Sequence, residues 1–269
     1  MLHIGWFSTA RGNSSRILLN SVFDKIQNGA LDVRIDFVFC SREPGESENT
    51  DLFIKQVNDY KIPLICFSVN KFAQVYHQPI GAKDGNLPGW RVEYDRQIMD
   101  RLKAFECKLC LLAGYMLIVG PEMCARYNMI NLHPALPSGP KGTWQGVIWQ
   151  LIKENADESG VMMHLVTPAL DRGPVISFCR YPIKGPPFDP LWAAISNIPL
   201  DDVKDLAGQE NDLFKLIRQN GFARETPLIL HTLSAFSSGK IAISGNRLRD
   251  AKGLSIAGYD LTDEINLEI

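Results

Sequence analysis

Short apolar segments alternate with amphipathic segments along the chain as far as about residue 183. The apolar segments have the length of buried strands, and the amphipathic segments carry apolar side chains at helical spacing. We expect strands at residues 2–8, 33–40, 63–67, 109–113, 129–133, 160–166 and 177–183, and helices at residues 15–27, 51–60, 91–105 and 143–155. This alternation predicts an α/β fold of Rossmann-like type, in which helices cover both faces of a predominantly parallel sheet.

Two stretches rich in glycine and proline interrupt this pattern, at residues 68–90 and 184–187. The first predicts a long irregular loop. After the second we expect one or two helices at residues 191–197 and 201–219, a helix at residues 227–237 that residues 224–227 cap, and a hairpin that begins at residues 240–244.

No internal repeat, low-complexity tract or interdomain linker is visible in the chain of 269 residues. We therefore expect a single domain over residues 1–269, with a core at residues 1–183 and an extended C-terminal region at residues 184–269.

The composition is ordinary for a soluble globular protein, with 45% hydrophobic residues, 22% charged residues and a formal net charge of −2. This charge gives no electrostatic footprint for nucleic acid. No apolar run approaches the ~18–20 residues of a membrane span, and the first residues do not have the pattern of a signal peptide. The six cysteines lie mostly in apolar, strand-like surroundings, which is typical of a reducing, cytoplasmic compartment.

Two of the cysteines, Cys107 and Cys110, have the C-x-x-C spacing that redox-active and metal-binding pairs use. The sequence offers neither a second pair of this spacing nor a histidine nearby. Because the segment also has the pattern of a helix end that enters a core strand, a packing role is favoured over a zinc or redox role.

Polar side chains with catalytic potential lie in the apolar strand at residues 129–133. Asn131 and His133 are two residues apart, so their side chains share one face of the strand, and two prolines stop the strand just beyond. An amide that donates beside an imidazole that carries a proton can stabilise a developing oxyanion. Downstream, Asp171 offers a carboxylate, which would stabilise the charged imidazole. These side chains predict acyl transfer without a nucleophilic side chain.

The two segments together resemble the signature of the folate-dependent formyltransferases. The first is Asn131-Leu132-His133-Pro134 followed by Gly142, and the second is Leu170-Asp171-Arg172-Gly173-Pro174-Val175-Ile176, whose aspartate lies 38 residues after His133. The likeness is strongest to the branch of that family that formylates glycinamide ribonucleotide. It runs over residues 1–183 and resumes more weakly at residues 222–243.

This resemblance implies the formyltransferase fold and transfer of a formyl group from 10-formyltetrahydrofolate, the co-substrate, to the amine of glycinamide ribonucleotide in de novo purine biosynthesis. In that reaction the amine is the nucleophile and the intermediate is tetrahedral. Asn131 and His133 would donate to its oxyanion, and Asp171 would orient a water that relays the proton from the amine to the departing nitrogen.

The glycine-containing loop after the first strand predicts an anion site, because the N–H groups at a helix N-terminus bind phosphate. An ordinary turn with a serine N-cap explains the same residues equally well. In the resemblance, Gly12, Asn13, Ser14 and Ser15 bind the phosphate of the ribonucleotide, although the family usually has a second glycine where this chain has Ser14.

The resemblance also implies a folate pocket. Arg91 takes the place of an arginine near the folate, and Met116, Ile118 and Val119 match the apolar pocket of the pterin ring. Plain core packing is the alternative for the three apolar residues.

Five further features qualify the resemblance. Glu225 takes the place of a glutamate that contacts the ribonucleotide, and from the sequence alone it is a first-turn acid that favours the helix dipole. The family often has an arginine at Leu117 and a small hydroxyl residue at Met162. We expect His164 to be a packing or supporting group. Residues 188–221 form an insertion without a counterpart in the short members of the family.

Other functions stay open. One is formylation of another amine, such as an amino sugar nucleotide or methionyl-tRNA, although the tRNA enzyme has an extra C-terminal β domain and a basic surface that we do not expect here. A formyltetrahydrofolate hydrolase would usually carry an N-terminal regulatory module, which we also do not expect. A non-catalytic folate-binding protein is the third. We expect small-molecule partners, namely a phosphorylated amine and a folate, and no metal, nucleic acid or membrane; a homodimer is possible.

Overall fold

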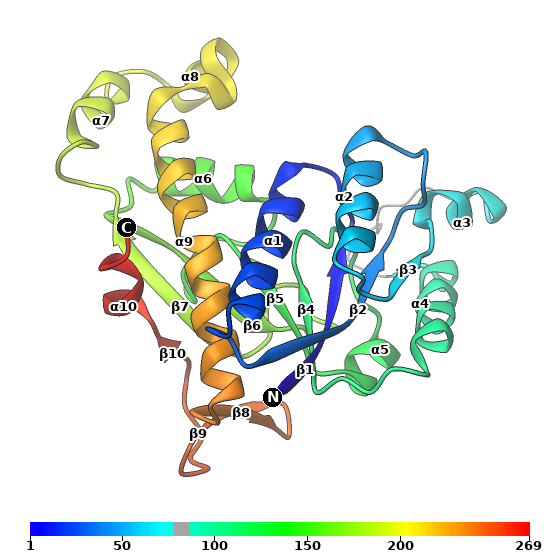
Figure 1. The fold of residues 1–269 in the computed structure, drawn as a ribbon. Coiled ribbons are helices and arrows are strands. Elements are labelled where there is room, and N and C mark those ends of the chain that lie inside the picture. The colour runs from blue at the N-terminus through cyan, green and yellow to red at the C-terminus, as the bar shows by residue number, and fades with distance from the viewer. Residues whose placement is uncertain (78–86) are drawn as a thin grey trace.

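A computed structural model describes residues 1–77 and 87–269 (Figure 1). An eight-stranded sheet with the order β10-β7-β6-β5-β4-β1-β2-β3 forms its centre, and β8 pairs with β9 in a separate hairpin. The strands are β1 (Leu2–Ser8), β2 (Val33–Cys40), β3 (Leu64–Cys66), β4 (Leu109–Leu112), β5 (Met129–His133), β6 (Glu158–Leu165), β7 (Val175–Pro182), β8 (Ile241–Ser244), β9 (Arg247–Asp250) and β10 (Tyr259–Asp260). Within the described part of the large sheet, β6 is the strand that runs against its neighbours. The expectation of a predominantly parallel, Rossmann-like sheet is therefore confirmed.

Helices cover both faces of this sheet. They are α1 (Asn13–Gln27), α2 (Glu48–Asp59), α3 (Val69–Val75), α4 (Gly89–Leu102), α5 (Pro121–Arg126), α6 (Trp144–Lys153), α7 (Asp189–Ile195), α8 (Leu200–Ala207), the 3-10 turn η1 (Gly208–Glu210), α9 (Asp212–Ser237) and α10 (Thr262–Asn266). The helices α1, α2 and α9 pack on one face, and α3, α4 and α5 pack on the other. Figure 1 shows α9 beside α1, reaching from α8 to the β8–β9 hairpin.

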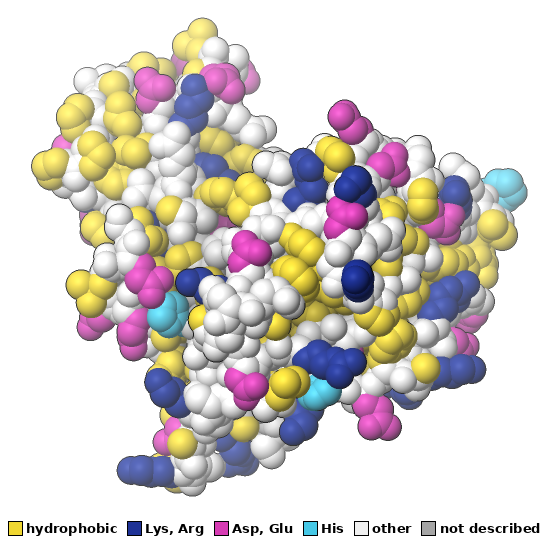
Figure 2. All heavy atoms as spheres, viewed as in Figure 1, with side chains coloured by type: hydrophobic (Ala, Val, Ile, Leu, Met, Phe, Trp, Pro, Cys, Tyr) yellow, Lys and Arg dark blue, Asp and Glu magenta, His cyan; other side chains and the backbone are white. Residues whose placement is uncertain are grey.

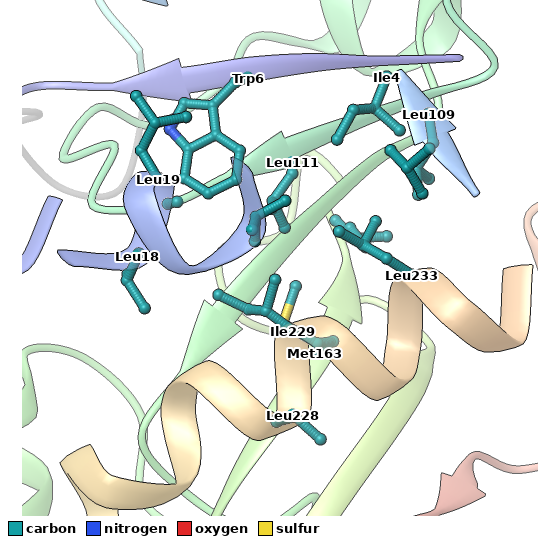
Figure 3. Close-up of a cluster of buried hydrophobic side chains, with 14 of the residues drawn as sticks. Ile4, Trp6, Leu18, Leu19, Leu109, Leu111, Met163, Leu228, Ile229 and Leu233 are labelled. Atoms are coloured by element: carbon teal, nitrogen blue, oxygen red, sulfur yellow. The ribbon is translucent and has the colours of Figure 1, made fainter. Parts of the chain in front are cut away.

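The alternation of side chains along each strand divides the core between the two faces. In β1, Trp6 belongs to the cluster beneath α1 and α9, whereas its neighbour Phe7 belongs to the cluster beneath α4. Figure 3 shows Ile229 and Leu233 of α9 directed toward the strands, with Leu228 on the same helix. All three are at most 1% exposed, and burying each such side chain contributes about 1.5–3 kcal/mol.

This burial explains why α9 differs from the expected helix at residues 227–237. The helix begins at Asp212 and continues through Pro227, which lies in its interior. An interior proline costs about 3 kcal/mol because it removes one hydrogen bond and crowds the preceding turn. Apolar residues on both sides of Pro227 are buried, Phe214 and Ile217 before it and Leu228 after it, and their burial outweighs that cost. The expectation that residues 224–227 cap this helix was wrong, and Glu225 lies in mid-helix.

Two other expectations need correction. Residues 68–90 were expected to be irregular, but Ser68 accepts a hydrogen bond from the Lys71 N–H and starts the helix α3; residues 78–86 of that stretch lie outside the described part. The helix expected at residues 201–219 is divided, because α8 ends at Gly208, which has a φ of +50° and adopts it without a Cβ penalty.

The segment at residues 188–221, which we expected to be an insertion, carries apolar side chains on its surface. Figure 2 shows hydrophobic atoms gathered in the region of α7 and α8, where Ile198 is 43% exposed and Leu206 is 82% exposed. In the described part of the chain, no helix has both the length and the apolar character needed to cross a membrane.

The Figure 3 cluster gives a stability prediction. Leu233→Ala removes a side chain that is 0% exposed, so we expect the free energy of unfolding to fall by about 2–5 kcal/mol. The matched control is Leu206→Ala, where the leucine is exposed and the expected change is within about 0.5 kcal/mol. Urea unfolding followed by circular dichroism measures both, and equal effects would contradict the assignment of α9 to the core.

Candidate functional site

The antiparallel pairing of β5 with β6 gathers four side chains on one face of the sheet. Asn131 lies opposite His164, and His133 lies opposite Met162. Directly opposed residues on neighbouring strands share a face, and residues two apart along a strand share it too. The expectation that Asn131 and His133 point the same way therefore extends to a second histidine.

Asp171 reaches this cluster from the loop between β6 and β7. One carboxylate oxygen lies 4.0 Å from Nδ1 of His133 and the other lies 3.6 Å from Nε2 of His164. Gly173 allows the loop to fold back, because a Cβ there would lie 1.7 Å from the Leu165 carbonyl oxygen. The structure thus brings together the three side chains that the sequence analysis selected, with His164 beside them.

Hydrogen bonds fix the proton positions on His164. Its Nδ1 lies 3.1 Å from the Leu165 carbonyl oxygen, which can only accept, so Nδ1 carries the proton. In the neutral ring Nε2 is then an acceptor, and the Asn131 amide nitrogen, 3.3 Å away, donates to it. Burial lowers the pKa of His164, although the hydrogen bond to Leu165 and the charge of Asp171 oppose the shift. The His164 ring thereby orients the Asn131 amide, and the second N–H of that amide stays free to donate elsewhere.

His133 is held on both sides of its ring. Its Nε2 lies 3.0 Å from the Pro140 carbonyl oxygen, so Nε2 carries a proton and donates it. Its Nδ1 faces Asp171 at 4.0 Å, which exceeds a direct hydrogen bond and suits a bridging water. The side chain is 3% exposed. An amide donor, an imidazole donor and a carboxylate therefore converge in surroundings largely shielded from water, where electrostatic interactions are strong.

The loop after β1 presents the N-terminus of α1. Gly12 is the N-cap residue, no side chain caps the helix, and no acidic residue lies in its first turn. A Cβ on Gly12 would meet nothing within 4 Å. Asn13 is exposed and Ser14 half-buried, whereas the Ser15 hydroxyl packs against Gly114. The geometry leaves open N–H groups at a positive helix end, which is an anion-binding arrangement.

A buried threonine joins this loop to the loop after β4. The Thr9 hydroxyl accepts hydrogen bonds from the Met116 N–H at 2.9 Å and from the Ser41 hydroxyl at 3.0 Å. The Thr9 N–H also donates to the Gly114 carbonyl oxygen. The expected phosphate loop and the expected folate loop are thereby fixed against each other.

Arg91 lies beneath the loop after β4 and is 2% exposed. One guanidinium nitrogen, Nη2, donates to Asp95 at 3.1 Å and to the Ile118 carbonyl oxygen at 2.8 Å, and Asp95 also accepts from the Gly120 N–H. Burial raises the pKa of Asp95, while the Arg91 charge opposes that shift. The pair supports the loop from below. Val119, at 3% exposed, packs in the core there.

The side chains of the expected folate pocket differ in their access to a ligand. Met116 is 55% exposed and Ile118 is half-buried, so both present surface. Arg91 and Val119 are buried. Leu117, where relatives often have an arginine, is half-buried among the apolar side chains around α4.

Glu225 lies apart from the histidine cluster. It is buried on α9 and pairs with Arg218, whose guanidinium lies 4.8 Å from the centre of the Trp144 ring. Burial raises the pKa of Glu225, and Arg218 opposes the rise. In the described part of the chain, no hydrogen bond or ion pair joins Glu225 to Asn131, His133 or Asp171.

Two residues make contacts at the site that could not be assigned from the sequence. His164 was expected to be a supporting group, and it contacts both Asn131 and Asp171; its signal was its alternation with Met162 in a strand that could pair with β5. Thr9 was not singled out, and its signal was a hydroxyl just after a buried strand. Among the described residues, no group of three or more histidine, cysteine, aspartate and glutamate side chains is arranged to hold a metal ion.

Two surface cavities lie away from this cluster. One of about 510 Å³ is formed between α1 and α2, and one of about 490 Å³ between α6, α7 and α8. Neither is lined by Asn131, His133, His164 or Asp171. The convergence of polar groups therefore locates the candidate chemistry better than cavity size does.

Comparison with known proteins gives one family. The sequence model described as formyl transferase matches residues 15–185, which is more than half of the chain. Phosphoribosylglycinamide formyltransferase of Escherichia coli is 32% identical over 95 residues, which span 35% of this chain and 44% of that protein. The enzyme of the same name from Haemophilus influenzae is 28% identical over 233 residues, or 80% of this chain and 94% of that protein.

Two further likenesses concern the fold and a related activity. The structure of phosphoribosylglycinamide formyltransferase from Coxiella burnetii superimposes with a TM-score of 0.68 at 21% identity, covering 96% of this chain and 98% of that one. At that identity the likeness concerns the fold. Formyltetrahydrofolate deformylase of Haemophilus influenzae is 29% identical over 163 residues, which span 59% of this chain and 48% of that protein.

The lowered pKa of His164 predicts a pH dependence of stability. Burial disfavours the imidazolium in the folded protein, so the unfolded chain binds that proton more readily below the ordinary value of 6.5. The free energy of unfolding should therefore fall as pH falls from about 6.5 toward 5. His164→Gln should flatten this slope, whereas the exposed His77→Gln should keep it. Urea unfolding at several pH values measures the slopes, and an unchanged slope in His164→Gln would contradict the assignment.

Proposed function

Because the chain belongs to the formyl transferase family, we propose that it transfers the formyl group of 10-formyltetrahydrofolate to the amine of glycinamide ribonucleotide. The observation that carries this proposal is the convergence of Asn131 and His133, on one face of β5, with Asp171 from the loop between β6 and β7. These side chains can stabilise an oxyanion and move a proton, and none of them needs to act as a nucleophile.

In the proposed reaction the substrate amine attacks the formyl carbon and the carbonyl oxygen becomes an oxyanion. The Asn131 N–H that His164 leaves free donates to this oxygen. The Nε2–H of His133 leaves the Pro140 carbonyl oxygen and donates its hydrogen bond to the oxyanion instead. Asp171 stabilises the positive charge on His133 and, through a water in the 4.0 Å gap to Nδ1, relays the proton of the amine to the departing nitrogen of the folate.

The two substrates approach from neighbouring loops in this proposal. The phosphate of the ribonucleotide binds at the N-terminus of α1, where Gly12, Asn13, Ser14 and Ser15 supply N–H groups and hydroxyls. Glu225 contacts the ribonucleotide, which requires it to leave Arg218.

The folate packs on the loop after β4. Met116 and Ile118 contact the pterin ring directly. Arg91 and Val119, being buried, act by holding that loop in place rather than by touching the ligand.

Hydrolysis of 10-formyltetrahydrofolate is the second candidate, because a deformylase is among the similar proteins. In both reactions the formyl oxygen becomes an oxyanion in a tetrahedral intermediate, and tetrahydrofolate is released. They differ in the nucleophile, which is the amine in transfer and water in hydrolysis. Dependence of the release on an acceptor therefore separates them.

The test measures tetrahydrofolate release against a panel of acceptors: glycinamide ribonucleotide, an amino sugar nucleotide, methionyl-tRNA and buffer alone. We expect release with glycinamide ribonucleotide and little with the others. Release in buffer alone at the same rate would favour hydrolysis. Release with another amine would mean that this amine, and not glycinamide ribonucleotide, accepts the formyl group. If no acceptor gives release although the folate binds, the proposal that the chain catalyses formyl transfer is contradicted.

Asp171→Asn tests the chemistry within the same assay. The amide keeps the shape but not the charge, so we expect kcat to fall on the order of 10²-fold while the folate dissociation constant changes little. Asp201→Asn is the matched control, because its carboxylate is 91% exposed on α8. A wild-type kcat in Asp171→Asn would mean that Asp171 shapes the turn and that its charge takes no part in the reaction.

Gly12→Val tests the phosphate site. The backbone of Gly12 is extended and a Cβ meets nothing within 4 Å, so the fold should tolerate valine. The added bulk should raise KM for the ribonucleotide by about tenfold or more, which corresponds to 1.4 kcal/mol per decade, and Gly12→Ala should have a smaller effect. Folate binding should stay unchanged. Loss of folate binding instead would mean that the two substrate sites are assigned in reverse.

A further inference from the structure

Cys107 and Cys110 lie close together at the N-terminal end of β4. Their sulfur atoms are 3.4 Å apart. The backbone around them is anchored on both sides, since the Lys108 N–H donates to the His3 carbonyl oxygen and the Cys110 N–H donates to the Asn128 carbonyl oxygen. A disulfide bond is about 2.05 Å long, so the sulfur atoms need to approach by about 1.4 Å. Side-chain rotation can supply this movement while the backbone keeps its hydrogen bonds.

The two thiols are chemically unequal. Cys107 is half-buried, whereas Cys110 is 0% exposed. The two sulfur atoms share a hydrogen bond in which either can donate. This bond lowers the pKa of Cys107; a backbone hydrogen bond from Gly5 acts in the same direction, and burial and Asp36 oppose it. The same bond and complete burial raise the pKa of Cys110. A half-buried sulfur, that of Cys107, thus faces a fully buried one, that of Cys110.

We propose that Cys107 and Cys110 are a redox modification site that forms a reversible disulfide by exchange with a small disulfide of the glutathione type. The Cys107 thiolate attacks one sulfur of the reagent, the S–S bond of the reagent breaks, and one small thiolate leaves. The Cys110 sulfur then attacks Cys107 and loses its proton as the second small thiol departs. Two electrons pass from the cysteine pair to the reagent, which ends as two thiols.

The other cysteines provide the contrast. Burial raises the pKa of the half-buried Cys124 to about 11, so little thiolate is present there at neutral pH. Cys40 and Cys66 also neighbour each other, on β2 and β3, and the Cys40 thiol lowers the pKa of Cys66, while burial and the charges of Glu43 and Glu46 oppose that shift. Because the sulfur atoms of Cys107 and Cys110 already lie 3.4 Å apart, we expect the first disulfide at this pair.

The experiment treats the reduced full-length protein with oxidised glutathione, traps free thiols with an alkylating agent and maps the cysteines by mass spectrometry. We expect a Cys107–Cys110 disulfide that excess reduced glutathione reverses. In short exposures to the alkylating agent alone, Cys107 should react at least about tenfold faster than Cys124, because each unit of lowered pKa gives about tenfold more thiolate.

Three variants sharpen the test. Cys107→Ser should abolish the disulfide, and the control Cys124→Ser should leave it unchanged. Cys110→Ala should accumulate glutathione on Cys107, because the attacking second sulfur is missing. Equal labelling of Cys107 and Cys124, or a first disulfide between Cys40 and Cys66, would overturn the proposal. If Cys110→Ala does not fold, the wild-type map and Cys107→Ser decide the outcome.

Discussion

The antiparallel pairing of β5 and β6 is the constraint on which the candidate site depends. In a sheet that is otherwise parallel within its described part, this reversal places His164 opposite Asn131 and returns the chain toward His133 through the Asp171 loop. A slip of one residue would turn every side chain of β6 to the other face. It would exchange His164 for Met163 or Leu165, which pack in the core beneath α9. The burial of Met163 and Leu165 in the core and the position of His164 at the site therefore require the same pairing of β6 with β5.

Burial is the second common factor, because both buried histidines of the site have a defined hydrogen-bond partner. His133 and His164 are each 3% exposed, and unpaired polar groups at such depth are costly. Each ring therefore has a backbone carbonyl oxygen as acceptor, from Pro140 and Leu165 respectively. Arg91 and Asp95 do the same for the loop after β4. The site is prearranged by hydrogen bonds rather than assembled by flexible side chains.

Much of this arrangement could be predicted from the sequence. The strand pattern gave β2 and β5 at their observed bounds, and the two-residue spacing placed Asn131 and His133 on one face. The course of α9 through Pro227 could not be predicted, because local propensity says nothing of the core that buries Leu228 beyond it. The partnership of His164 with Asn131 depends on strand register, which is a property of the folded sheet. The roles of the site residues remain predictions.

The Thr9 hydroxyl has a consequence for how two ligands would bind. It accepts hydrogen bonds from Met116 and Ser41 while the Thr9 N–H binds Gly114, so the loops after β1, β2 and β4 share one buried junction. Whatever restricts the motion of one loop restricts the others, and the conformational entropy is lost once rather than separately for each ligand. If both loops bind ligands as proposed, occupancy of one loop would strengthen binding at its neighbour without any contact between the ligands. Such cooperativity would depend on the buried side chain of Thr9.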